Sequence, residues 1–112
     1  MRLLAAVLAA SAASLHYPHH LTPARLRLLV YRTHPCLAHI IDHEDGTWQP
    51  TRVGLGGSYG LPQAQPGAKM ASAGPDWRTN PWTQIRWALQ YARARYGSEC
   101  AAWAWWQAHS YW

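Results

Sequence analysis

Glu44 is the residue of this chain best placed for acid–base chemistry. Acidic side chains are scarce, because two glutamates and three aspartates stand against ten basic residues. Glu44 follows an apolar run that contains Ile40 and Ile41, and Gly46 predicts a turn shortly after it. Burial among apolar side chains raises the pKa of a carboxyl group, and so does the negative end of a helix. We therefore predict a general acid that works near neutral pH; the alternative is a solvated glutamate in a last helical turn.

Two histidines spaced four residues apart suggest a second chemistry, metal binding. His39, Asp42 and His43 are similar to the His-x-x-Glu-His pattern of some zinc peptidases. Asp42 is shorter than the glutamate that serves as base in those sites, and only His34 or His109 is available as a third ligand. The sequence therefore favours a site without metal, and a zinc hydrolase is the less favoured alternative.

Helices that begin at capping residues must position these side chains. Thr22-Pro23 and Asn80-Pro81 each match an N-cap followed by proline at the first helical position. Ser98 caps a last helix in the same way. Pro35 begins the helix whose final turn carries Glu44, because Thr33-His34 interrupts the preceding apolar segment.

The longest predicted helix, from residue 81 to residue 96, should provide the main packing surface. Its apolar stripe consists of Trp82, Ile85, Leu89, Ala92 and Tyr96. Gly97 ends this helix. We expect the stripe to pack behind Glu44 through Ile85 and Leu89.

The segment between the two central helices is rich in glycine. Residues 46–60 contain five glycines and predict a short hairpin or an irregular loop, while residues 66–73 predict one or two helical turns. The chain is long enough for one domain, which we place at residues 23–112. We expect a mainly α fold in which a small Gly-rich insertion follows the helix of Glu44.

The order of motifs from residue 36 to residue 112 resembles the soluble lytic transglycosylases of the lysozyme superfamily. It is most similar to the short forms found in actinobacteria and their phages. That family has Glu-Ser at a helix end, then a proline, Gly-Leu-x-Gln, a helix with Asn-Ile and a tyrosine, and a final Ala-Ala-Tyr-Asn. The matching segments here are Glu44-Asp45, Pro50, Gly60-Leu61-Pro62-Gln63, Gln84-Ile85 with Ala88 and Tyr91, and Ala101-Ala102-Trp103-Ala104. The resemblance implies an α+β lysozyme-like fold and cleavage of peptidoglycan glycan strands without a cofactor.

The resemblance also implies roles for single residues. Glu44 would be the only catalytic acid and base, Tyr91 would stand near it, and Trp103 would form an aromatic wall. Gln63 and the backbone before it would hold the glycan or its peptide stem. The substrate-binding residues implied in this way are Trp48, Tyr59, Gly60, Leu61, Gln63, Tyr91 and Trp103.

The chemistry of that family needs only one carboxylate. The glutamate protonates the oxygen between N-acetylmuramic acid and N-acetylglucosamine, while the 2-acetamido group of the substrate supports the positive charge at C1. The deprotonated glutamate then activates the C6 hydroxyl of the same sugar, and a 1,6-anhydro sugar forms. Hydrolysis by water needs a second carboxylate, for which Asp45 and Asp76 are the loop candidates.

Three departures from the family pattern keep a second function open. Asp45 replaces the usual serine, the spacing to Pro50 is one residue longer than in many members, and Trp103-Ala104 replaces Tyr-Asn. The alternative is a module of lysozyme-like fold that binds peptidoglycan without cutting it. Its stacking surfaces would be Trp48, Trp103, Trp105 and Trp106.

The N-terminus predicts export. Arg2, an apolar run over residues 3–10 and Ala10-Ser11-Ala12 match a signal peptide over residues 1–13, followed by a linker over 14–22. The alternative is an alanine-rich helix that stays on the protein. We expect a protein that is secreted or in the cell envelope, or otherwise belongs to a phage virion or a lysis system.

The two cysteines bear on whether the chain is exported, and the net charge bears on its partner. An even cysteine count in an exported chain predicts a disulfide between Cys36 and Cys100, whereas two buried free thiols fit a chain that is not exported. The net charge of +5 favours an anionic partner. Because the basic residues are spread along the chain, nucleic acid is not expected. We expect a monomer without stable membrane insertion.

Overall fold

The structure is a computed structural model that describes residues 21–112. The predicted signal peptide over residues 1–13 and residues 14–20 of the predicted linker lie outside this range. The described part is mainly helical. Its elements are α2 (Pro23–Thr33), α3 (Pro35–Glu44), the 3-10 helices η1 (Leu55–Gly57) and η2 (Gly67–Ala73), α4 (Pro81–Tyr96) and α5 (Glu99–His109).

The predicted helix ends are confirmed. The side chains of Thr22, Asn80 and Ser98 each accept a backbone N–H of the following first turn, at 3.2, 2.9 and 3.0 Å. Gly97 ends α4 in the left-handed region, with φ of 94°. Each cap satisfies a backbone donor that the helix itself leaves unpaired, so these ends are fixed by local chemistry.

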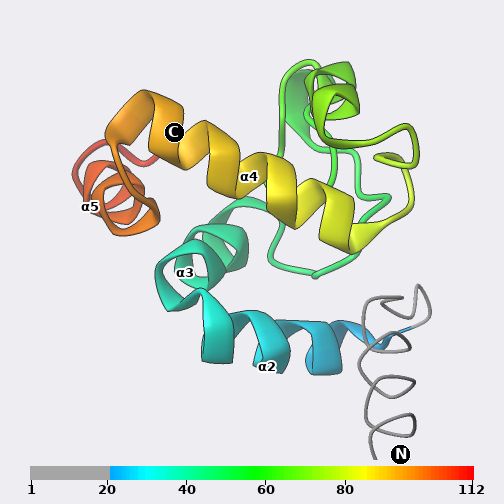
Figure 1. Ribbon diagram of the computed structural model, residues 1–112, viewed down its shortest axis with the longest axis horizontal. Coiled ribbons are helices and arrows are strands. Elements are labelled where there is room, and N and C mark those ends of the chain that lie inside the picture. The colour runs from blue at the N-terminus through cyan, green and yellow to red at the C-terminus, as the bar shows by residue number, and fades with distance from the viewer. Residues whose placement is uncertain (1–20) are drawn as a thin grey trace, which may run out of the picture.

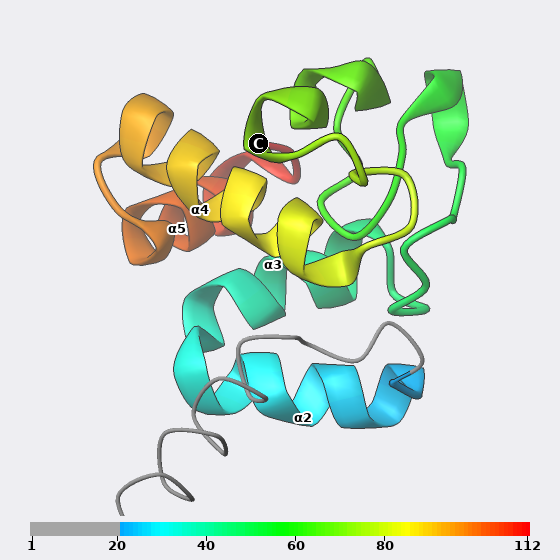
Figure 2. The ribbon, with the colours of Figure 1, turned by 45° about the vertical axis from the view of Figure 1, so that its right-hand side comes forward.

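Helix α4 crosses the middle of the molecule (Figures 1 and 2). Helices α2 and α3 lie on one side of it, and most of the segment of residues 45–80 lies on the other, although Trp48 near its start packs beside Tyr31 of α2. Helix α5 packs against both α3 and α4. The end of α3 therefore comes between α5 and the irregular segment, which places Glu44 where three parts of the chain meet.

The segment between α3 and α4 is irregular. Two isolated antiparallel bridges join Tyr59 to Val53 and to Ala64, and residues 21–112 contain no longer strand. Helix η2 supplies the helical turns predicted over residues 66–73. Tyr59 also donates its hydroxyl to the carbonyl of Arg78 at 2.7 Å, so the turns of this segment are tied to one another.

Buried apolar side chains form two adjoining clusters. The larger one joins α2, α3, α4 and the irregular segment: Leu26, Val30, Leu37, Ala38, Ile41, Trp48, Leu61, Ala64, Met70, Trp77, Ile85, Trp87 and Ala88. The smaller one contains Ile40, Ala92 and Ala102, one from each of α3, α4 and α5. Two alanines at this junction let the three helices approach closely, and removal of these surfaces from water stabilises the fold.

The predicted disulfide is present. Cys36 at the start of α3 and Cys100 at the start of α5 are bonded, with their Cα atoms 5.0 Å apart. Sixty-four positions separate them in sequence. The bond ties α5 to the helix that carries Glu44, and a cross-link over so long a loop stabilises the fold by restricting the unfolded chain.

The packing face of α4 differs from the predicted stripe. Ile85 is buried, but Trp82, Leu89 and Tyr96 are only half-buried. Ala92 of the predicted stripe is buried as well, and the other buried positions of the helix are Pro81, Thr83, Gln84, Trp87 and Ala88. The apolar pattern of the sequence could not predict this packing face, because the polar Gln84 is buried by hydrogen bonds to other parts of the chain.

This packing face predicts that truncation of two side chains of α4 lowers the free energy of unfolding by different amounts. Ile85→Ala should lower the free energy of unfolding by about 2 to 4 kcal/mol, because it opens a cavity in the core. Leu89→Ala should lower it by about 1 kcal/mol, because that side chain is half-buried. Urea unfolding of both variants checks this, and a larger loss for Leu89→Ala would contradict the observed packing face.

Candidate functional site

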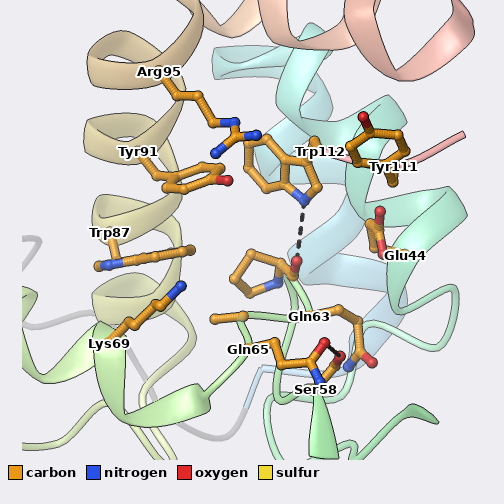
Figure 3. Close-up of a pocket in the computed structure, with 12 residues that line it drawn as sticks. Glu44, Ser58, Gln63, Gln65, Lys69, Trp87, Tyr91, Arg95, Tyr111 and Trp112 are labelled. Atoms are coloured by element: carbon orange, nitrogen blue, oxygen red, sulfur yellow. Dashed lines mark hydrogen bonds between the residues drawn. The ribbon is translucent and has the colours of Figure 1, made fainter. Parts of the chain in front are cut away.

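A cleft of about 350 Å3 opens beside the end of α3. Its walls come from α4, from residues 58–65, from η2 and from the last two residues of the chain (Figure 3). The lining residues are Glu44, Ser58, Pro62, Gln63, Ala64, Gln65, Lys69, Trp87, Tyr91, Arg95, Tyr111 and Trp112. Glu44 is the only acidic side chain among them.

Glu44 is held in position by one strong hydrogen bond. It is the last residue of α3 and is half-buried. The indole N–H of Trp106 in α5 donates to Glu44 Oε1 at 2.8 Å. Burial raises the pKa of Glu44 above its usual range, while the Trp106 hydrogen bond and the nearby His43 partly oppose the rise. The carboxyl group can thus keep its proton at a higher pH than an ordinary glutamate.

One face of α4 forms the opposite wall of the cleft. Trp87, Tyr91 and Arg95 follow one another at intervals of four residues, so they lie above one another on the helix (Figure 3). The rings of Trp87 and Tyr91 are stacked with centroids 4.9 Å apart. Trp112 meets Tyr91 edge to face at 5.1 Å and donates its indole N–H to the carbonyl of Pro62 at 3.2 Å. Tyr91 and Trp112 are half-buried, whereas Trp87 is buried, so the ring surface open to the cleft comes mainly from Tyr91 and Trp112.

The floor of the cleft is a turn around Gln63. Gln63 has a left-handed backbone, with φ of 53°, and its Nε2 donates to the carbonyl of Gly60 at 2.9 Å. Gln65 Nε2 donates to the carbonyl of Gly56 at 2.8 Å. Both amides therefore bind the backbone of their own segment, and they hold the floor in shape.

Gln84 holds this floor from behind. Its side chain is fully buried in α4, where Oε1 accepts the N–H of Leu61 at 2.9 Å. Its Nε2 donates to the carbonyls of Pro50 and Trp77, each at 2.8 Å. Gly60 has φ of 76°, and a Cβ atom there would lie 2.6 Å from Gln84 Oε1. Glycine at this position allows the floor to lie directly on the amide.

Three of the predicted site residues meet in the cleft: Glu44, Gln63 and Tyr91. Trp48 does not belong to the lining. It is buried in the larger core cluster and donates its indole N–H to Asp42 Oδ1 at 2.8 Å. This hydrogen bond and the core packing hold the ring away from the cleft, where it was predicted to lie.

The other predicted residues are structural neighbours of the cleft. Tyr59, Gly60 and Leu61 are absent from the lining: Tyr59 packs edge to face on Trp77, and Leu61 is buried in the core. Trp103 lies outside the cleft as well, because its ring stacks on the imidazoles of α3. The structure thus places the predicted aromatic wall at Trp103 outside this cleft.

The remaining acidic side chains of the described part have partners outside the cleft. Asp42 accepts hydrogen bonds from Arg27, Tyr31 and Trp48. Burial raises its pKa, but these bonds outweigh burial and lower the pKa to about 2. Asp45 is buried and accepts from the hydroxyl of Thr47 at 2.5 Å. These carboxylates stabilise the loop and α2 against α3.

Asp76 and Glu99 also have structural partners. Asp76 accepts from the side chains of Asn80 and Thr83 at 2.8 and 2.6 Å, next to the start of α4. Glu99 lies 3.4 Å from His34. The two loop candidates for a second acid, Asp45 and Asp76, are thus both outside the cleft lining.

The histidine pair of α3 is occupied by aromatic packing. The rings of His39 and His43 stack on Trp103 with centroids 5.1 and 5.4 Å apart. Asp42, between them in sequence, turns to Arg27. Within residues 21–112 no three His, Cys, Asp or Glu side chains come together as a metal site. The geometry therefore gives the zinc alternative no support.

Sequence reasoning missed several lining residues. Trp87 and Arg95 could have been found, because they share the four-residue spacing of Tyr91 along α4. Lys69 and Trp112 could not, because tertiary packing alone brings η2 and the chain end to the cleft. Trp106 was considered only as a stacking surface, and its bond to Glu44 depends on how α5 is rotated against α3.

Comparison of the chain with models of known protein families, with curated proteins and with solved structures finds no match. Across residues 21–112, no helix combines the length and the apolar character needed to cross a membrane. The case for a function therefore rests on the geometry of the cleft.

Proposed function

We propose that this protein cleaves peptidoglycan as a lytic transglycosylase, with Glu44 as general acid and base. The observation that carries the proposal is a single half-buried carboxyl group of raised pKa that lines a cleft with an aromatic wall. With a raised pKa, such a group keeps the proton that it donates up to a higher pH than an ordinary glutamate does. Tyr91 is half-buried and presents its ring to the cleft as a surface against which a sugar ring can pack, while Trp87 is 8% exposed and supports that ring from the core.

The distribution of carboxylates favours transglycosylation over hydrolysis with two carboxylates. The latter needs a second carboxylate about 5 to 9.5 Å from the first. Within the described residues the cleft lining contains only Glu44, and the other four acidic side chains bind structural partners. The substrate's own acetamido group must then support the charge at C1.

The proposed reaction uses Glu44 twice. Its carboxyl proton passes to the oxygen of the β-1,4 bond between N-acetylmuramic acid and N-acetylglucosamine as the C1–O bond breaks. The carboxylate then accepts the proton of the C6 hydroxyl as that oxygen bonds to C1, which gives 1,6-anhydro-N-acetylmuramic acid and restores the acid. Trp106 holds Oε1 throughout, so Oε2 is the oxygen that carries the proton.

We extend the proposal to the type of fold and to the location of the protein. A catalytic glutamate at a helix end, followed by a Gly-rich segment, fits a reduced lysozyme-like fold. A disulfide is typical of proteins in oxidising compartments, which fits a monomer that acts on the cell wall from outside the cytoplasm.

Mass spectrometry of the fragments released from purified peptidoglycan tests the proposal. We expect 1,6-anhydromuramyl ends, and we expect EDTA to leave the activity unchanged. Release of reducing muramic ends would show hydrolysis by water instead. Loss of activity in EDTA would overturn the metal-free mechanism.

A binding module without catalysis is the second candidate. The Trp106 bond to Glu44 favours it, because a hydrogen bond to a carboxylate stabilises the charged form, which cannot donate a proton. Sedimentation with insoluble peptidoglycan distinguishes the two functions: a module would bind the polymer and release no fragments.

A further inference from the structure

Two basic side chains stand at opposite ends of the aromatic wall. Arg95 of α4 lies at one end and Lys69 of η2 at the other, with Trp87 and Tyr91 between them (Figure 3). Both are solvent-exposed. They face the cleft from the side opposite Glu44, so the cleft has two positive groups on one wall and one acid on the other.

Three other arginines of the described part bind groups of their own chain. Arg27 pairs with Asp42 at 2.9 Å, Arg52 lies 3.6 Å from Asp45, and Arg86 donates to the carbonyl of Ala73 at 2.8 Å. No acidic side chain of residues 21–112 forms an ion pair with Lys69 or Arg95.

The guanidinium of Arg95 is positioned by aromatic groups rather than by a carboxylate. Its Nε donates to the hydroxyl of Tyr96 at 3.1 Å, and the group lies 6.0 Å from the ring centroid of Tyr91. Most of its N–H donors thus remain available to a ligand, and a guanidinium matches a carboxylate with two parallel hydrogen bonds.

We propose that Arg95 and Lys69 select a glycan that bears carboxylate groups, and that a sugar ring of this glycan packs against Tyr91. The inference rests on the proposed function and names the property of the substrate that this wall recognises. A neutral glycan would cover the aromatic faces but leave both cations without a counter-charge. A glycan with a carboxylate on alternate sugars can satisfy the stacking surface and the cations together.

Two matched oligosaccharides test this selection. Oligomers of alternating N-acetylglucosamine and N-acetylmuramic acid without peptides carry lactyl carboxylates, and chito-oligosaccharides of equal length do not. Binding is measured by calorimetry with Glu44→Gln, so that no ligand is consumed. We expect the anionic oligomer to bind at least about tenfold more tightly at low salt. The preference should shrink as salt screens the charges.

Variants distinguish the effect of these two side chains on binding from a general effect of surface charge. Arg95→Gln and Lys69→Gln should each reduce the preference severalfold and leave chito-oligosaccharide binding nearly unchanged. Arg93→Gln is the matched control, since Arg93 is exposed on the same helix and does not line the cleft. Equal binding of the two oligomers, failure to bind either, or an equal effect of Arg93→Gln would overturn the inference.

The outcome is separable from that of the proposed function. If wild type prefers the anionic oligomer through Arg95 and Lys69 but cuts no glycan, the selection stands and the proposed catalysis fails. If wild type cuts peptidoglycan but its glycan binding ignores charge, the catalysis stands and the selection fails.

Discussion

Glu44→Gln should reduce glycan cleavage by about a hundredfold to ten-thousandfold, which is the usual contribution of a positioned acid–base group. The amide keeps the size of the side chain, and its oxygen can still accept the Trp106 N–H seen at 2.8 Å. It cannot donate a proton to the glycosidic oxygen as a carboxylic acid does. The measurement is the rate of soluble fragment release from peptidoglycan.

Asp42→Asn is the matched control for this substitution. Asp42 lies on the same helix, but its carboxylate binds Arg27 and Trp48 outside the cleft. We expect it to lower stability by about 1 kcal/mol, through loss of a partly exposed ion pair, with activity close to wild type. If Glu44→Gln remains fully active, the catalytic assignment fails.

The stability of Glu44→Gln tests the raised pKa of Glu44 independently of the activity. Because burial raises the pKa of Glu44 in the folded chain, the folded state binds the proton more tightly than the unfolded state. This contribution to stability is present below the pKa of the unfolded group, and it is lost as pH rises through the raised folded value. The neutral amide avoids this loss, so the variant should be at least as stable as wild type at neutral pH.

The pH dependence of cleavage should report the same carboxyl group. If protonated Glu44 is the acid, kcat/KM should fall as pH rises through its pKa. Trp106→Phe removes the N–H that favours the carboxylate, so the pKa of Glu44 should rise and the falling limb should move to higher pH. If the falling limb of the pH profile does not move in Trp106→Phe, the group that titrates there is not Glu44.

The helix framework could be predicted because its signals are local. Thr22, Asn80 and Ser98 announce helix starts through side chains that bind the next turn. The position of Glu44 at the end of an apolar helix could be predicted for the same reason, and the structure places it there, beside the cleft. Such signals need only a few neighbouring residues, and tertiary packing did not override them.

The sequence could not predict which aromatic side chains reach Glu44, because this depends on how the helices are rotated against one another. Trp103 and Trp106 are three residues apart in α5, yet one stacks on His39 and the other binds Glu44. Ala102 fixes the rotation by packing against Ile40 and Ala92, which lie in other helices. The burial of Trp48 could not be predicted either, because the turn after α3 folds its ring back onto Asp42.

Gln84→Glu should cause the largest loss of stability among the substitutions considered, about 4 kcal/mol at neutral pH. The native Nε2 donates to the carbonyls of Pro50 and Trp77, each at 2.8 Å, in a fully buried position. A carboxylate of the same shape would place a negative oxygen against both carbonyls. It would also leave these acceptors without a donor, and an unpaired buried polar group costs about 1 to 3 kcal/mol.

The loss should depend on pH in a predictable direction. A protonated glutamic acid at position 84 can donate to one of the two carbonyls, so the folded chain should raise the pKa of the introduced group. The variant should therefore be most stable at low pH, and its deficit should grow as pH rises above about 4. Urea unfolding at several pH values measures this dependence.

Gln90→Glu provides the control for Gln84→Glu, because Gln90 is exposed on the same helix and the change of charge is identical. It should alter stability by less than about 0.5 kcal/mol. Glycan cleavage by Gln84→Glu should fall even where the variant remains folded, since Leu61 depends on this amide to hold the floor that carries Gln63. Equal stability of the two variants would show that the floor is held by other contacts and that the buried amide is dispensable.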